Sequence, residues 1–236
     1  GSFLIVLQAL IFILIFLFNE SREYTSGWAL VSWFILVVLS PSAVTLFDMH
    51  GKKLVDGAID NLSGIAIASG VGRYFAKENN RLDHIELRVL SFGSEEMGLK
   101  GSQAYAKRIL SESKEKPITV LNVDTIRSPR HFNIISEEHN PFTFYDKELI
   151  AELEKSFKKE NVAFKVSSIG IGATDGTSFH RKGISVLSMI GIDTKKPDPT
   201  YHTRLDTIDN LDPEGLEQLK KVLCRFISDR DKELSS

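Results

Sequence analysis

The sequence predicts an α/β sandwich, and three observations lead to that prediction. Short apolar runs alternate with amphipathic stretches along the chain after residue 53. The chain has 236 residues, which is enough for a single α/β domain that fills most of its length. It shows neither an internal repeat nor a low-complexity tract, so it is best described as one layered domain with an N-terminal appendage.

Four stretches have the pattern of helices. Their apolar residues recur at helical spacing, and in one of them Leu149, Ile150, Leu153 and Phe157 share a face. The last helix is expected to open at Asp212, a capping residue that is followed by a proline in the first turn. The predicted helices are residues 61–77, 99–112 and 147–159 and the stretch from residue 212 onward.

Five apolar runs have the length and composition of strands. The predicted strands are residues 84–92, 118–123, 132–136, 162–166 and 186–190. Acidic residues follow two of these runs directly. Ligands gather at strand ends in open α/β sheets, so these acidic residues are candidates for a site.

The charge and cysteine content exclude some classes of protein. The chain carries 29 basic and 31 acidic residues without a basic stripe, so we expect no nucleic-acid partner. Its one cysteine, Cys224, rules out an internal disulfide. Cys224 falls in the apolar pattern of the last predicted helix, where it is expected to act as a small buried hydrophobe.

The first 47 residues differ in composition from the rest. Residues 3–18 form an apolar run broken only by Gln8, and residues 28–47 contain no charge. About twenty apolar residues span a bilayer, so this pattern predicts a two-helix transmembrane hairpin over residues 1–47. The remaining residues, 48–236, would form the α/β domain. A signal peptide or a pair of buried core helices would also be apolar, but neither explains two such runs.

This hairpin predicts an integral membrane protein that contacts the lipid bilayer through residues 3–18 and 28–47. Lys52 and Lys53 follow the second run, while the loop between the runs has one Arg and two Glu. By the positive-inside rule, the domain after residue 52 would face the cytoplasm.

Acidic residues and one late histidine suggest a metal site. Asp60 lies in a Gly- and Ser-rich segment, Glu95 and Glu96 follow one predicted strand, and Asp124 ends another. His202 comes near the end of the chain. Carboxylates that converge repel one another strongly unless a cation neutralises them. Zinc binds imidazole nitrogen and carboxylate oxygen, so the sequence predicts a zinc site. Each of these signals alone has a plainer interpretation as a solvated turn or a cap.

Five motifs in fixed order carry a family resemblance. They are DGAIDNLSG (56–64), GSEEMGLKGS (93–102), NVD (122–124), ATDGTSFHRKGI (173–184) and YHTRLDTID (201–209). Together they resemble the zinc aminopeptidase family that includes bacterial leucyl aminopeptidase, aminopeptidase Y, glutamate carboxypeptidase II and glutaminyl cyclase. The resemblance covers residues 54–230. It implies a three-layer αβα sandwich around a mostly parallel mixed sheet, as in zinc exopeptidases, and one or two zinc ions per chain.

The resemblance also implies roles for individual residues. Asp60 would bridge two zinc ions and the peptide bond after it would be cis. The remaining roles are a general base at Glu95, metal ligands at Glu96, Asp124 and His202, and an oxyanion-stabilising phenol at Tyr201. Two further carboxylates are expected beside the site. Asp175 would either orient a ligand or cap a helix, and Asp206 would fix the loop that carries His202.

One feature departs from the family pattern. The family has a His-x-Asp motif at the end of an earlier strand, and no such motif precedes Asp60 here. His50 is a weak substitute, because Gly51 and Lys52 follow it and no orienting carboxylate is present. We expect the missing histidine and the first strands to lie upstream of residue 1. The remaining histidines are treated as non-ligands. They are His84, His131, His139 and His180.

The sequence therefore predicts a zinc-dependent exopeptidase and favours an aminopeptidase acting on peptide substrates. Glu95 would take a proton from a metal-activated water and pass it to the leaving amine. Two alternatives stay open. One is an acyltransferase like glutaminyl cyclase, which uses a related single-zinc site. The other is a non-catalytic domain that binds a partner at the membrane.

Overall fold

A mixed β-sheet forms the centre of the domain. The computed structural model describes residues 54–113, 116–139, 142–170 and 172–235. The strands are β1 (Thr119–Ile126), β2 (Asn133–Glu138), β3 (Thr143–Phe144), β4 (Lys165–Ile169) and β5 (Ser185–Gly191). They follow the order β1-β5-β2-β3, and β4 pairs with β2. The β1–β5 and β2–β4 pairs are parallel, whereas β2 runs antiparallel to β5 and β3.

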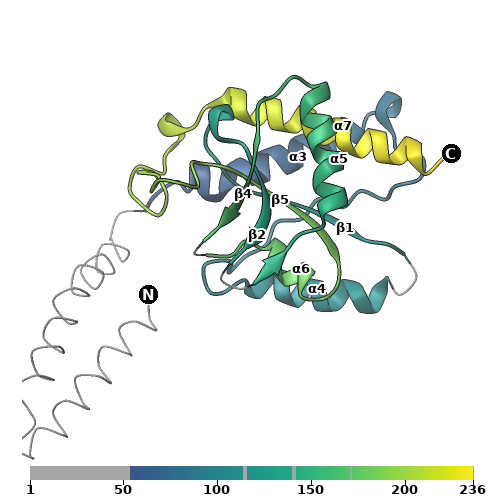
Figure 1. Cartoon of the computed structure of the whole chain (residues 1–236), viewed down its shortest axis with the longest axis horizontal. Coiled ribbons are helices and arrows are strands. Elements are labelled where there is room, and N and C mark those ends of the chain that lie inside the picture. The colour runs from purple at the N-terminus through teal and green to yellow at the C-terminus, as the bar shows by residue number, and fades with distance from the viewer. Residues whose placement is uncertain (1–53, 114–115, 140–141, 171, 236) are drawn as a thin grey trace, which may run out of the picture. The chain divides into compact units, whose positions relative to one another are not determined.

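Helices cover both faces of this sheet. They are α3 (Ser63–Phe75), α4 (Lys100–Glu112), α5 (Lys147–Lys159), α6 (Gly176–His180) and α7 (Pro213–Glu233). Figure 1 shows α3 and α7 on one side of the sheet and α4 and α6 on the other. On the first side, α7 packs against both α3 and α5. The short helical turns are η1 (Ala58–Leu62), η2 (Glu78–Asn80), η3 (Pro129–His131) and η4 (Ile208–Asn210).

The predicted helices form close to their expected positions. The apolar stripe of α5 is buried, including Leu153 and Phe157, which are at most 1% exposed. Asp146 caps this helix by accepting a hydrogen bond from the Glu148 amide at 2.8 Å. Asp212 caps α7 in the same way, with the Glu214 amide at 3.1 Å. The apolar face of α5 and the side-chain caps of α5 and α7 explain why the sequence predicted where these helices lie.

The strand predictions are confirmed for β1, β2 and β5, and β4 begins three residues later than expected. The strand predicted at 84–92 is wrong, because that segment joins no ladder among the described residues. Its Leu87 and Phe92 pack against the core, while Val89 and Leu90 are more than 40% exposed. An apolar run becomes a strand only when a neighbour accepts its hydrogen bonds. The sheet is also less parallel than predicted, because β2 lies antiparallel to β5.

The membrane prediction is corrected. No helix in residues 54–235, as far as they are described, has the length and apolar character needed to cross a bilayer. Residues 3–18 and 28–47, on which the hairpin and the bilayer contact were predicted, lie outside the described residues. The proposed boundary at residues 47 and 48, the lysines at 52 and 53, and His50 also fall there. The integral-membrane localisation is therefore not carried forward.

Candidate metal centre

The loop that carries Asp60 is fixed to the end of β1. The peptide bond between Asp60 and Asn61 is cis, as the family resemblance implied. The Asn61 side-chain nitrogen Nδ2 donates to the Val123 carbonyl at 3.0 Å. The Asn61 side-chain oxygen Oδ1 accepts from the Gly64 backbone amide at 3.0 Å. A Cβ on Gly64 would lie 2.4 Å from the Val123 carbonyl oxygen, so only glycine permits this approach. Asp60 is thereby held beside β1, the strand that contains Asp124.

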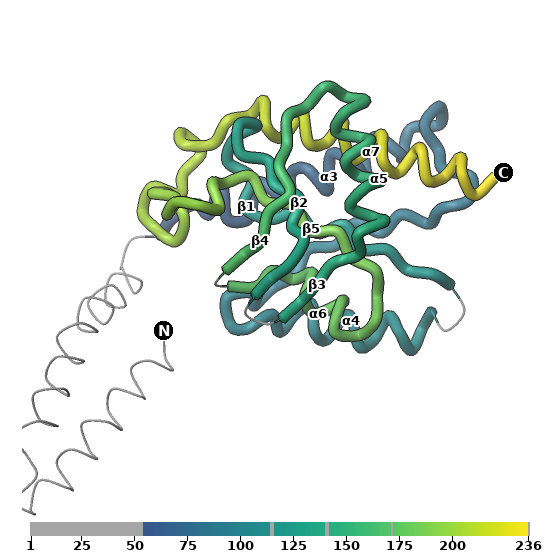
Figure 2. Tube along the Cα trace, in the orientation of Figure 1, coloured from purple at the N-terminus to yellow at the C-terminus, as the bar shows by residue number. Residues whose placement is uncertain are grey.

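Asp206 holds the same loop from the other side. Its two carboxylate oxygens accept hydrogen bonds from the Ile59 amide at 2.6 Å and the Asp60 amide at 3.2 Å. Asp206 is buried, with only 5% of its surface exposed. The segment around His202 is therefore joined directly to the backbone of Asp60. Figure 2 shows this yellow-green loop near the blue start of the described chain.

Left-handed backbone conformations surround the candidate residues. Ser94, just before Glu95, has φ +58°, and Leu99, at the start of α4, has φ +60°. Thr125 and His202 have φ +50° and +56°. Such conformations are unfavourable for residues other than glycine and persist where surrounding contacts enforce them. Their occurrence around the predicted residues suggests that the loops are shaped for a ligand.

Three predicted ligands meet in space. The His202 Nε2 atom lies 3.0 Å from Glu96 Oε1 and 3.3 Å from Asp60 Oδ2. One ligand atom from each of these residues lies within 4.8 Å of the other two. Hydrogen bonds with Asp60 and then Glu96 raise the pKa of His202 to about 10. An imidazole and two carboxylates within this distance form a donor set that fits zinc.

Asp124 lies close by but outside that group of three. Burial and then the charge of Asp60 raise the pKa of Asp124 to about 7. The Thr125 hydroxyl donates to Asp124 Oδ1 at 2.9 Å. The Thr125 amide, next to Asp124, donates to the side-chain oxygen of Asn61, next to Asp60, at 3.3 Å. The two carboxylates therefore lie on adjoining segments, and a cation between them would relieve their repulsion.

Glu95 is partly buried and has several acidic neighbours. Its pKa rises to about 8, first because it is partly buried and then because of charges on Asp124, Glu96 and others nearby. A carboxyl group with a pKa near neutrality can both accept and return a proton. This position therefore suits the general base that the family resemblance implied.

Tyr201 lies against the histidine of the group. Its ring stacks on His202, with ring centres 3.9 Å apart and planes inclined by 19°. Burial and then the charges of Asp60 and Asp124 raise the pKa of the phenol above its usual value. Tyr201 thus keeps its proton at neutral pH and can act as a hydrogen-bond donor.

Asp175 has a buried oxygen without a partner. It precedes α6, yet its side chain makes no capping hydrogen bond, so the cap interpretation is not supported. Its Oδ1 atom is buried and has no hydrogen-bond partner. Burial raises the pKa of Asp175, and a hydrogen bond with Ser102 opposes that rise. The charge of Asp175 also raises the pKa of Glu95, so it lies near the site.

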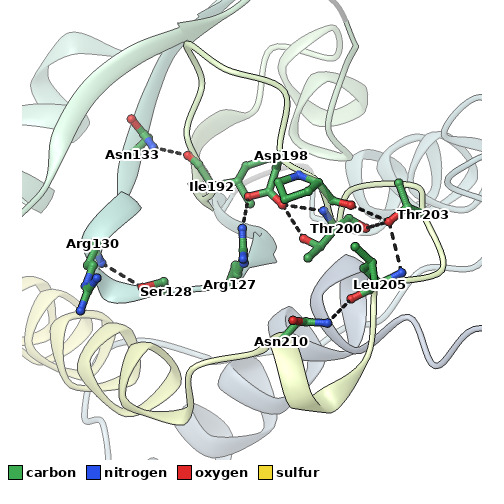
Figure 3. Close-up of polar contacts among 11 residues, drawn as sticks. Arg127, Ser128, Arg130, Asn133, Ile192, Asp198, Thr200, Thr203, Leu205 and Asn210 are labelled. Atoms are coloured by element: carbon green, nitrogen blue, oxygen red, sulfur yellow. Dashed lines mark hydrogen bonds and ion pairs between the residues drawn. The ribbon is translucent and has the colours of Figure 1, made fainter.

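Two polar features beside the site were not predicted from the sequence. Arg127 forms an ion pair with Asp198 on the loop before His202 (Figure 3). Glu138 is fully buried at the end of β2. Its oxygens accept hydrogen bonds from the Tyr145 hydroxyl at 2.7 Å and the Thr177 hydroxyl at 2.6 Å. Neither Arg127 nor Glu138 lies in one of the five motifs, and their partners Asp198 and Thr177 are 71 and 39 positions away, so the sequence did not predict these contacts.

Comparison with known proteins identifies the family. Residues 44–227 match peptidase family M28. Aminopeptidase NAALADL1 from Rattus norvegicus is 25% identical over 197 residues, which cover 72% of this chain and 26% of the relative. Aminopeptidase YwaD from Bacillus subtilis is 26% identical over 171 residues, covering 69% and 35% respectively. The chain therefore spans only a quarter to a third of the length of these relatives.

Solved structures show the same fold. A zinc aminopeptidase from Bacillus subtilis, BSAP, superposes with a TM-score of 0.63 at 21% identity, covering 75% of this chain and 43% of that one. A glutaminyl cyclase from Porphyromonas gingivalis superposes with a TM-score of 0.59 at 18% identity, covering 75% and 65%. At this identity the likeness concerns the fold alone. The family match extends over most of the sequence and includes every candidate residue described above, and the chain therefore belongs to peptidase family M28.

Proposed function

We propose that this chain is a zinc-dependent aminopeptidase that hydrolyses the N-terminal peptide bond of peptides. The observation that carries the proposal is the meeting of Asp60, Glu96 and His202 beside Glu95. Membership of peptidase family M28 and relatives named as aminopeptidases support it. A non-catalytic binding role would not require a partly buried Glu95 among so many like charges.

The proposed roles follow from the positions of the side chains. Asp60, Glu96 and His202 would hold zinc, with Asp124 as a further ligand. Zinc, when bound, supplies the Lewis acidity that activates water and polarises a carbonyl group near neutral pH. Glu95 accepts the proton of the attacking water and returns it to the departing amine. The Tyr201 hydroxyl donates a hydrogen bond to the oxygen on which negative charge develops.

The ligands available favour one zinc ion. Asp60, Glu96 and His202 suffice for one tetrahedral zinc site whose fourth position stays open for water. Asp60 and Asp124 would supply only part of a second site if Asp60 served two ions. The proposal is therefore one complete zinc site, with a second ion requiring ligands from water or from elsewhere.

A second candidate is an acyltransferase that cyclises N-terminal glutamine. The observation that favours it is the Asp, Glu and His composition of the group formed by Asp60, Glu96 and His202. This set resembles the single-zinc site of glutaminyl cyclases. Both candidates use the same residues, so the substrate distinguishes them.

One assay separates the candidates. The zinc-loaded chain is incubated with a panel of aminoacyl chromogenic substrates, with an N-blocked peptide and with a peptide that begins with glutamine. We expect release of the N-terminal amino acid from the first group. Ring closure of the glutamine peptide without hydrolysis would instead support the acyltransferase. Release from the carboxyl end of the blocked peptide would support a carboxypeptidase, and no reaction with any substrate would contradict all three activities.

Replacing Glu95 tests the proposed base. Glu95→Gln should leave zinc affinity within a few-fold of the original and lower turnover by about 100-fold or more, because a positioned base contributes on that scale. Zinc affinity is measured by chelator competition and turnover by the assay above. Glu78→Gln, at an exposed position on η2, is the matched control and should change neither quantity. Undiminished turnover in Glu95→Gln would remove Glu95 from this role.

A further inference from the structure

The loop that carries Tyr201 and His202 depends on polar contacts for its shape. It connects the end of β5 at Gly191 with the start of α7 at Pro213 and contains only the short turn η4. Within it, the Thr203 hydroxyl donates to the Pro199 carbonyl at 2.7 Å. No strand or long helix fixes the position of His202, so turn hydrogen bonds and side-chain contacts do so.

Two aspartates hold this loop to the rest of the domain. Asp206 follows His202 by four positions and accepts hydrogen bonds from the Ile59 and Asp60 amides. Asp198 precedes His202 by four positions and pairs with Arg127, at 2.8 Å between Nη1 and Oδ2. The Asp198 side chain is 4% exposed, so this ion pair is shielded from water on one side. The histidine is thus held between two anchors.

Arg127 contacts the loop at its start, middle and end. Its amide donates to the Gly191 carbonyl at 3.3 Å. Its side chain binds Asp198, as Figure 3 shows, and its carbonyl accepts from the Asp212 amide at 2.9 Å. Arg127 follows β1, the strand that contains Asp124. Arg127 therefore connects the end of β1 to both ends and to the middle of the loop.

The contacts of Asp198 continue toward the histidine. Its second oxygen accepts from the Thr200 amide at 2.9 Å and from the Thr200 hydroxyl at 2.5 Å. Its carbonyl accepts from the Tyr201 amide at 3.3 Å. Thr200 is 2% exposed. Each contact narrows the conformations that Tyr201 and His202 can adopt.

We propose that Arg127 is a positioning residue for the metal centre, and that its ion pair with Asp198 keeps His202 facing Asp60 and Glu96. The inference rests on the proposed function, because it takes His202 as a metal ligand. It adds a residue that is outside the group formed by Asp60, Glu96 and His202 and that none of the five motifs contains. Groups that orient metal ligands typically change metal affinity by about 10- to 100-fold when they are removed.

The experiment uses the full chain, four test variants and one control variant. Arg127→Met and Asp198→Asn each remove one partner, the double variant removes both, and Arg127→Lys keeps the charge but not the planar donor group. Arg225→Met is the matched control, because Arg225 also forms an ion pair at 2.8 Å, with Glu160, away from the loop. Zinc dissociation constants are measured by competition with a chromogenic chelator. Amide hydrogen exchange is measured for residues 200–206 in the metal-free chain.

We expect zinc binding to weaken about 10- to 100-fold in Arg127→Met and in Asp198→Asn. The double variant should bind zinc about as weakly as the weaker single variant, because both changes remove one interaction. Exchange at residues 200–206 should accelerate in these variants, Arg127→Lys should be intermediate, and Arg225→Met should match the original chain in both measurements.

Unchanged zinc affinity and unchanged exchange in a folded Arg127→Met chain would overturn the inference. If that variant does not fold, Asp198→Asn decides the question, because it keeps the shape of the side chain. Absence of zinc binding by the original chain would instead refute the proposed function. Exchange at residues 200–206 would still decide whether the ion pair fixes the loop.

Discussion

The Asp206 carboxylate lies where two candidate metal-binding segments touch. It is buried, and both of its oxygens accept backbone amides from the segment that carries Asp60. A carboxylate is suited to this position because it has only acceptors to offer. The geometry of Asp60 therefore depends on a residue four positions after His202.

Replacing this carboxylate should be costly. Asp206→Asn places an amide donor opposite one backbone donor, so we expect a loss of about 2 kcal/mol in the free energy of unfolding. Urea unfolding of the metal-free chain gives this value. Asp209→Asn, at an exposed position three residues later, is the control and should change stability by less than about 0.5 kcal/mol. Equal stability of the two variants would show that the Asp206 contacts contribute little.

The sequence predicted the candidate ligands and the supporting Asp206, whereas it did not predict the contact between Arg127 and Asp198. Asp60, Glu96 and His202 belong to short motifs, and the structure brings them together. Arg127 and Asp198 are 71 positions apart, and an isolated arginine has many possible partners. Only the fold decides which of them it meets.

At the scale of elements, the C-terminal helix α7 also holds the segment at residues 83–85 through hydrogen bonds. Asp231 on α7 accepts hydrogen bonds from three successive amides, those of Asp83 at 3.0 Å, His84 at 2.9 Å and Ile85 at 2.9 Å. This contact fixes the start of the segment that leads to Glu95. Burial alone would raise the pKa of Asp231, but the three amides together hold it below its usual value.

The lowered pKa gives a pH dependence with a definite sign. The stabilisation by Asp231 is present above the unfolded-state pKa of about 3.9 and is lost as pH falls through the lower folded-state pKa. Asp231→Asn should therefore reduce the free energy of unfolding by about 1–2 kcal/mol at pH 7 and by much less below about pH 3. Urea unfolding at both pH values measures the difference. Asp229→Asn, which breaks only an ion pair with the exposed Lys159, should have a small effect at pH 7. A pH-independent loss in Asp231→Asn would contradict the prediction.

Helices with a one-sided apolar pattern could be predicted, and so could the apolar runs that became β1, β2 and β5. The helix α5 occupies the residues expected from its pattern, because its buried face and its cap both lie within the segment. The strand expected at 84–92 did not form, because strand formation depends on a neighbouring strand that the local sequence does not specify. The antiparallel pairing of β2 and β5 likewise depends on topology rather than on either segment alone.

At the scale of the whole molecule, metal binding should be linked to folding. The candidate ligands come from distant parts of the chain, so an unfolded chain does not bring them together and zinc should favour the folded state. At a zinc concentration 100 times the dissociation constant, the stabilisation is about 2.7 kcal/mol. For a domain of this size, that corresponds to a rise in Tm of roughly 5–10 °C.

Thermal unfolding with zinc and with EDTA measures this effect. His202→Ala should lose most of the zinc-dependent rise in Tm, because it removes the imidazole of the candidate group. His131→Ala, outside that group, should respond to zinc as the original chain does. Equal responses of the two variants would argue that zinc binds elsewhere.

The hydrogen bonds between Asp206 and the backbone at residues 59 and 60 connect positions 147 and 146 apart. A ribosome adds these positions in order, so the nascent polypeptide exposes Asp60, Glu95, Glu96 and Asp124 before the stabilising carboxylate and the imidazole exist. A product of premature termination would retain the acidic cluster but lack His202. If the proposed function holds, catalytic competence should therefore arise only after the segment that contains His202 and Asp206 has been synthesised.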